Sequence, residues 1–199
     1  MNRSRILLYG CGIVGAGSFL FAAYAQKTPP LPKWSADKAL VKNLTEVVEI
    51  EGFSIQPPRG YEMQEGNAPE GMKAMGWVGE QRSDGVRPSL ALIIINIPKA
   101  EAKKYTLEQV TEKIAGGIKL RRTEWQQGKI EKGVINGSTF ARLRWTGIAP
   151  SGQLKMQGFI YTVRNGNAFL SFTSQDAVLE AKQSLALAET SVFTFKKLP

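Results

Sequence analysis

Histidine is absent from this chain of 199 residues, and cysteine occurs only once, at Cys11. Without histidine, the chain lacks the commonest general base near neutral pH and the commonest metal ligand in proteins. Ser-His-Asp and Cys-His nucleophile systems are thereby excluded, as is a zinc site built from cysteine and histidine. A single cysteine also excludes a disulfide framework. We therefore predict no catalytic residue, no metal ligand and no cofactor, and we expect a protein that is not an enzyme.

The remaining composition is that of a globular protein. Apolar residues make up 43% of the chain and charged residues 22%, which excludes a collagen-like, coiled-coil or wholly disordered protein. A chain of this length holds one domain, or one domain with a small appendage. Lysine and arginine number 26 against 17 aspartate and glutamate residues, for a formal net charge of +9. This excess of positive charge favours anionic partners.

Residues 1–25 have the composition of an export signal. Arg3 and Arg5 precede an uncharged, mostly apolar stretch from Ile6 to Ala25, which ends in Ala23-Tyr24-Ala25. Small residues at two positions separated by one residue, here Ala23 and Ala25, are typical of a signal peptidase site, so we predict cleavage after Ala25. Because residues 1–25 contain no adjacent pair of arginines, export by the Sec route is favoured over the twin-arginine route. The predicted location is the periplasm or the extracellular space.

Two alternatives remain for the same segment. Residues 6–25 are long enough to span a bilayer as an uncleaved anchor. Leu8-Tyr9-Gly10-Cys11 resembles a lipoprotein signal, but only five residues separate Arg5 from Cys11. Residues 26–45 follow as a proline-rich linker with a short amphipathic segment that includes Trp34, and we expect residues 26–33 to be extended and mobile. Residues 46–199 then form a single domain.

The pattern of the remaining residues predicts an α+β domain. Strands are expected at residues 46–50, 53–56, 75–79, 89–97, 128–134, 139–147, 153–164 and 168–173. Thr106-Leu107-Glu108-Gln109 fits a capping box, which predicts a helix starting near Thr106. A second helix is expected at residues 177–190, with Asp176 as its cap. Apolar residues on both faces of the strands indicate an antiparallel sheet between two layers, one of them incomplete.

The two strands around Pro150 can be paired through a tight turn at residues 149–152. This pairing places Leu143 opposite Gly158 and Trp145 opposite Met156. Arg142 and Arg144 then share the opposite face of the strand, and Lys155 lies near them. The prediction is a sheet face on which apolar residues are interrupted by arginine.

The order of these elements resembles that of the PsbP-like fold. The resemblance rests on the run from Gly52 to Tyr61 (GFSIQPPRGY), the helix at Thr106, Ile135-Asn136-Gly137 before a basic strand, and a last helix ending in Ser191-Val192-Phe193. It covers residues 45–197 and implies an α-β-α sandwich with a central, mostly antiparallel sheet. The family includes extrinsic subunits of the photosynthetic oxygen-evolving complex, a nuclear Ran-binding protein and exported bacterial proteins of the DUF1795 type. The exported group is the nearest match, and no family residue with a known role maps onto this chain.

A set of basic residues is the feature that stands out above the background. The candidate binding residues are Arg142, Arg144, Lys155, Arg121, Arg122, Arg82 and Arg87; Lys119 and Arg164 belong to the same charge pattern. A positive patch formed by them attracts an acidic envelope protein or an anionic membrane or cell-wall surface. Nucleic acid needs the same charge, but export argues against it. The alternative is a dispersed basic surface with no binding role.

These observations predict a non-catalytic, exported accessory or binding domain that is a monomer or a weak oligomer. The alternative function is a small-molecule or lipid carrier with an apolar pocket between the sheet and a helix. A deep apolar cavity favours the carrier, whereas a filled core argues against it.

Overall fold

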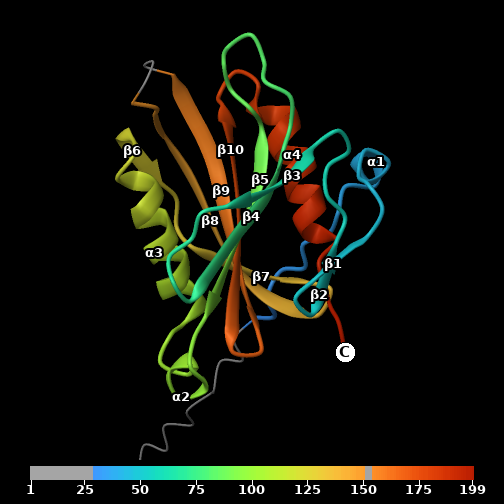
Figure 1. The fold of residues 1–199 in the computed structure, drawn as a ribbon, viewed down its shortest axis with the longest axis vertical. Helices are drawn as coiled ribbons and strands as arrows, with labels where there is room; N and C mark the ends of the chain where they lie inside the picture. The colour runs from blue at the N-terminus through green and yellow to red at the C-terminus, as the bar shows by residue number, and fades with distance from the viewer. Residues whose placement is uncertain (1–28, 151–153) are drawn as a thin grey trace, which may run out of the picture. The chain divides into compact units, whose positions relative to one another are not determined.

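A long, twisted antiparallel sheet forms the centre of the fold, as Figure 1 shows for this computed structural model. Its strands lie in the order β3 (Glu62–Gly66), β4 (Met72–Val78), β5 (Ser89–Asn96), β10 (Ala168–Ala177), β9 (Lys155–Asn165), β8 (Ser138–Ile148) and β6 (Thr123–Gln127), and β7 (Glu131–Ile135) pairs with β8 beside β6. The structure describes residues 29–150 and 154–199, and residues 31–199 form one compact unit. The expected export signal lies outside the described residues. No helix in the described part of the chain is long and apolar enough to cross a membrane.

Two layers cover this sheet. Helix α3 (Leu107–Lys119) lies on one face, against β8, β9 and β10. Helix α4 (Ala181–Phe193) lies on the other, together with a small sheet of β1 (Val48–Ile50), β2 (Phe53–Ile55) and β11 (Lys196–Lys197), as Figure 1 shows. Short helices α1 (Lys38–Val41) and α2 (Lys99–Ala102) complete the fold. The predicted α+β sandwich with an antiparallel sheet is confirmed.

Helix α3 starts where the sequence predicts it. The Thr106 hydroxyl accepts a hydrogen bond from the Gln109 amide, and the Gln109 side chain accepts one from the Thr106 amide. This reciprocal cap satisfies two amides that would otherwise lack partners at the start of the helix. Val110 and Ala115 are buried against the sheet.

Helix α4 starts later than predicted, at Ala181 and not at residue 177. The expected cap, Asp176, is wrong: this residue lies within β10, one position before its end, and its side chain is fully buried. Residues 178–180 form the connection between β10 and α4. Propensity misplaces the start because strand β10 extends to Ala177 to pair with Met156.

The β8–β9 pair differs from the predicted register by two residues. Leu143 lies opposite Ile160, and Trp145 lies opposite Gly158. The connection is longer than a tight turn, because Ile148 pairs with Lys155. A shift of two residues keeps every side chain on its predicted face, because strand side chains alternate with period two. Arg142 and Arg144 therefore do share one face, as predicted.

The strand expected at residues 128–134 is confirmed only in part, as the shorter β7. Strand β6 before it was not predicted, and the two strands pair with different parts of β8. The β6–β8 register shifts between Thr123 and Gln126, and Glu124 takes a positive φ of 49°. Such an irregularity bends an edge strand and interrupts its pairing.

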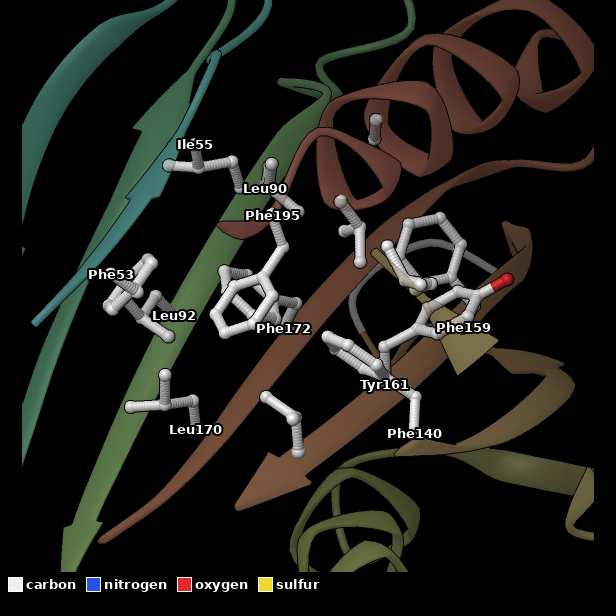
Figure 2. Packing of buried hydrophobic residues seen from close by; sticks show 14 of the residues in the cluster. Phe53, Ile55, Leu90, Leu92, Phe140, Phe159, Tyr161, Leu170, Phe172 and Phe195 are labelled. Atoms are coloured by element: carbon white, nitrogen blue, oxygen red, sulfur yellow. The ribbon is translucent and has the colours of Figure 1, made fainter. Parts of the chain in front are cut away.

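Aromatic side chains fill the space between the sheet and the α4 layer. Figure 2 shows Phe172 beside Phe195 and Phe159 beside Tyr161. The ring centroids of Phe53 and Phe195 are 5.4 Å apart, and those of Phe159 and Tyr161 are 5.2 Å apart. All five rings are at most 1% exposed. This filled core does not offer the apolar pocket that the carrier alternative requires between the sheet and this helix.

The segment before α1 is tied to the domain at Pro32 and Trp34. The Val134 amide donates to the Pro32 carbonyl, and the Trp34 amide donates to the Val134 carbonyl. The Trp34 ring lies against Gly133, where any side chain would collide with it, and it meets Tyr161 edge-on at 5.5 Å between ring centroids. The predicted mobility of residues 26–33 is therefore wrong for its last residues. A lone tryptophan in a polar segment gave no sign of its partner, Gly133, which lies 99 residues further along the chain.

Candidate functional site

An open groove lies between α4 and the strands β6, β8 and β9, with a volume of about 540 Å³. Its apolar part is formed by Leu185, Ala181 and Ala186. Its polar side chains are those of Gln126, Gln127, Arg144, Thr146, Gln157, Lys182 and Glu189. Glutamine amides both donate and accept hydrogen bonds, and Arg144 and Lys182 carry positive charge. The lining therefore suits a polar ligand with negative charge.

Two periodicities bring these side chains together. Arg144 and Thr146 share the face of β8 that looks toward α4, because strand side chains alternate, and Gln157 of β9 lies directly opposite Thr146. On α4, Lys182, Leu185 and Glu189 follow at intervals of three and four residues, so they occupy one face of the helix. The groove is therefore a consequence of the α4 crossing over the β8–β9 pair.

Glu189 holds the inner end of the groove. One of its carboxylate oxygens accepts hydrogen bonds from the Tyr161 hydroxyl and from Arg144, and lies 3.5 Å from the Arg142 guanidinium. The Glu189 side chain is 18% exposed, whereas that of Arg144 is 50% exposed. Glu189 thus fixes the position of Arg144 while leaving several guanidinium donors free for a ligand.

Arg142 lies beneath the groove and serves the fold. Its Nε donates to Glu131 at 3.0 Å, and its Nη1 donates to the Tyr161 hydroxyl at 3.1 Å. The guanidinium also lies over the Trp34 ring, 4.6 Å from the centroid. Burial alone would lower the pKa of Arg142, but the hydrogen bonds with Tyr161 and Glu131 outweigh it and raise this pKa. With an 18% exposed side chain, Arg142 is unavailable as a surface cation.

Two tyrosine hydroxyls resist ionisation. Burial, followed by the nearby charge of Glu189, raises the pKa of Tyr161 well above its ordinary value of 10. Burial, followed by the charge of Asp176, raises the pKa of Tyr61 to about 12. Both hydroxyls therefore stay protonated in the folded protein at pH values where an unfolded chain has begun to ionise.

Alkaline conditions are therefore expected to destabilise the protein. Below pH 10 both states keep the tyrosine protons, but between about pH 10 and 12 the unfolded state loses them first, so the free energy of unfolding falls as pH rises. Urea denaturation at a series of pH values from 8 to 12 measures this slope. The variants Tyr161→Phe and Tyr61→Phe are each expected to flatten it, and an unchanged slope in both would contradict the assignment.

The predicted basic set does not assemble into one patch. Arg142, Arg144 and Lys155 do lie on the same face of the β8–β9 pair, with Lys155 opposite Ile148, four residue pairs beyond Arg144. Arg122 lies on the other side of the sheet, where its guanidinium stands over Trp145 at 5.8 Å and donates to Gln175. Arg121, its neighbour, is exposed. The two groups are therefore separated by the sheet itself.

Arg82 is a structural residue. Its guanidinium donates to both carboxylate oxygens of Asp176, with Nη1 to Oδ2 at 2.8 Å, and to Asp84 at 3.0 Å. These hydrogen bonds raise the pKa of Arg82 further, and Arg82 holds the pKa of the Asp84 carboxyl below its ordinary value. Arg87 donates from Nε to the Gly79 carbonyl, which closes the same loop. Neither residue lies in the groove lining.

Sequence reasoning missed most of the groove. Gln126, Gln127 and Gln157 carry no charge, and Lys182 and Glu189 lie on a helix whose start was misplaced. The spacing of Lys182, Leu185 and Glu189 is the one signal in the sequence from which a shared helix face could have been predicted. Within the described residues, no three acidic side chains lie close enough together to hold a metal ion.

The layer order and the sheet topology are those of the PsbP-like fold. A solved structure with this fold is cyanobacterial PsbP (CyanoP) from Synechocystis, studied in solution. It matches this chain with a TM-score of 0.56 and 14% sequence identity, over 89% of this chain and 98% of that one. At this identity, the likeness establishes the fold and nothing more.

Two further structures resemble the chain less closely. The Ran-binding protein Mog1p from Saccharomyces cerevisiae gives a TM-score of 0.45 at 12% identity, over 77% of this chain and 96% of that one. LpqN of Mycobacterium tuberculosis, which is involved in cell envelope biogenesis, gives 0.43 at 12% identity, over 84% of this chain and 99% of that one. No family model and no curated sequence matches this chain, so membership of the DUF1795 type remains a prediction.

Proposed function

We propose that this protein is a non-catalytic, exported binding domain and that its groove holds an acidic segment of an envelope protein. The observation that carries the proposal is the pairing of two exposed cations, Arg144 and Lys182, with glutamine side chains over an apolar floor. An acidic peptide needs all three: cations for its carboxylates, amides for its backbone and an apolar surface for its side chains.

The charge of the groove agrees with this ligand. Glu189 is its acidic lining residue, and this carboxylate already receives hydrogen bonds from Tyr161 and Arg144 with Arg142 nearby. It is therefore neutralised by groups beneath the groove, and it repels an incoming carboxylate only weakly. Because these donors hold it, Glu189 is also poorly placed to accept a proton from a substrate, which supports a binding role over a catalytic one.

A salt-dependent pull-down from envelope extract tests the proposal. The wild-type protein is expected to retain a partner at low ionic strength and release it as salt rises. The double variant Arg144→Gln/Lys182→Gln removes two charge-assisted contacts, each worth about 1.5–3 kcal/mol, so the partner's affinity should fall at least tenfold. A photocrosslinker placed at Gln126 should then attach to an acidic peptide of that partner, which mass spectrometry identifies.

A matched control removes the same charge elsewhere. Lys196→Gln/Lys197→Gln changes two exposed lysines of β11, outside the groove lining, and is expected to leave retention unchanged. Circular dichroism checks that Arg144→Gln folds. We expect it to fold, because Glu189 still accepts the hydrogen bond from Tyr161 and still lies beside the Arg142 guanidinium. Retention of no partner at low salt, or equal loss in the groove variant and the control, would overturn the proposal.

A further inference from the structure

One end of the long sheet, called here the loop end, gathers three connections that the structure describes in full. It comprises the β4–β5 loop at residues 79–88, the α3–β6 turn at residues 120–122 and the β10–α4 turn at residues 178–180. The strand pairings place them together, because Val78 and Gln175 both pair with Ser89, and Thr123 and Lys155 both pair with Ile148. Figure 1 shows these connections at the top of the molecule.

Two leucines project from the loop end. Leu120, which follows α3, is 89% exposed, and Leu179, which precedes α4, is 92% exposed. A single exposed leucine is ordinary on a protein surface, but these two are the most exposed large apolar side chains among the described residues, and both lie at the same end of the sheet. Because α3 and α4 lie on opposite faces of the sheet, the two leucines stand on either side of it, as two separate points of one surface.

Basic residues flank Leu120 directly, and one lies near Leu179, whose own neighbours in the chain are Val178 and Glu180. Lys119 and Arg121 are the direct neighbours of Leu120, and the carbonyl of Lys155 accepts a hydrogen bond from the Val178 amide, next to Leu179. These three cations are exposed, and among the described residues none lies within ion-pair distance of a carboxylate.

The acidic groups of the loop end do not cancel this charge. Asp176 and Asp84 are both held by Arg82. Outside these ion pairs, the carboxylates are Glu80, Glu124 and Glu180, and the cations are Lys119, Arg121, Lys155, Arg87 and the partly exposed Arg122. Because one guanidinium serves both aspartates, the loop end carries six basic and five acidic residues, and this small positive excess favours an anionic partner.

We propose that the loop end is a peripheral docking surface for an anionic lipid bilayer. Leucine side chains enter the boundary between headgroups and acyl chains, and lysine and arginine bind the lipid phosphates above it. A bilayer accepts two separated leucines without a matching pocket, whereas a protein partner needs a complementary surface at both. This surface is separate from the groove, and the proposal does not depend on the acidic peptide suggested above.

Cosedimentation with vesicles tests the docking surface. The protein is recovered after export by its own cell and mixed with one of two kinds of vesicle. One kind is pure phosphatidylcholine, and the other is phosphatidylcholine with about 30% phosphatidylglycerol. Wild type is expected to bind the anionic vesicles at least tenfold more tightly, because each basic residue near such a surface contributes about a factor of five.

Matched variants identify the surface that binds. Leu120→Ser/Leu179→Ser and Arg121→Gln/Lys155→Gln are each expected to weaken binding to anionic vesicles about tenfold. The controls are Val47→Ser/Met63→Ser, which changes two apolar side chains with exposures of 58% and 55%, and Lys196→Gln/Lys197→Gln; both should bind as wild type does.

The outcomes separate docking from other modes of attachment. Binding that ignores lipid charge and survives both loop-end variants would overturn the proposal and assign attachment to the N-terminal residues. Equal losses in the loop-end variants and the controls, or no vesicle binding, would also overturn it. A loss confined to the loop-end variants, with the pull-down through the groove unchanged, would support it.

Discussion

Replacing Arg82 with alanine is expected to lower the free energy of unfolding by about 3–5 kcal/mol, because it leaves a buried carboxylate without its counter-charge. Asp176 is 0% exposed, and its oxygens are shared between Arg82, the Ser184 hydroxyl and the Ala177 amide. Without the guanidinium, two neutral donors remain for a full negative charge. Urea denaturation of wild type and Arg82→Ala, monitored by tryptophan fluorescence, measures the difference.

Two further variants show whether the ion pair is the cause. Arg87→Ala changes an exposed arginine of the same loop and is expected to cost less than about 1 kcal/mol. Arg82→Met/Asp176→Leu removes both charges and should recover most of the lost stability, since apolar pairs of similar volume can replace a buried ion pair. A loss below about 1 kcal/mol for Arg82→Ala would show that Asp176 does not depend on it.

Gly158→Ala is expected to destabilise the protein by about 3 kcal/mol, at the upper end of the usual range for overpacking. An added Cβ would collide with the backbone carbonyl of Ser174 on β10 and would lie 2.7 Å from the Trp145 ring. Neither neighbour gives way easily, because the first is sheet backbone and the second is stacked on Trp125 with ring centroids 4.9 Å apart. Thermal denaturation followed by calorimetry measures the loss.

The matched control makes the same chemical change in open space. An added Cβ at Gly116, within α3, would meet no atom within 4 Å. Gly116→Ala is therefore expected to stabilise the protein by about 0.5–1 kcal/mol, because alanine has the higher helix propensity. If both alanine variants moved the midpoint in the same direction, the close approach at Gly158 would not be the cause.

Local signals were enough to predict much of the fold. The capping box at Thr106 and the apolar run at Ser89 depend on neighbours within a few residues, and the structure confirms both. The β8–β9 register was off by two residues, because the alternation of side chains fixes which face each one occupies but not its partner. The start of α4 was wrong because pairing of Ala177 with Met156 prolongs β10.

The site was less predictable than the fold, for a physical reason. Arg142 and Arg144 were correctly placed on one face. Whether the charge of each is available to a ligand depends on Glu131 and Glu189, and Glu189 lies 45 residues beyond Arg144. A single sequence does not show which carboxylate neutralises which guanidinium across such a separation. Arg82 was placed in a binding patch for the same reason, because its partner Asp176 is 94 residues away.

The attachment of Pro32 and Trp34 to β7 limits how far the domain can stand from anything joined to residue 25. Only residues 26–31 remain between the predicted cleavage position and the first residue that the domain holds, and six residues span at most about 22 Å when fully extended. Val134 pairs with Thr139 near the hairpin at Asn136, which is the end of β8 remote from Ile148. A chain that kept its apolar N-terminal segment would therefore be joined to it by a short tether at this end of β8.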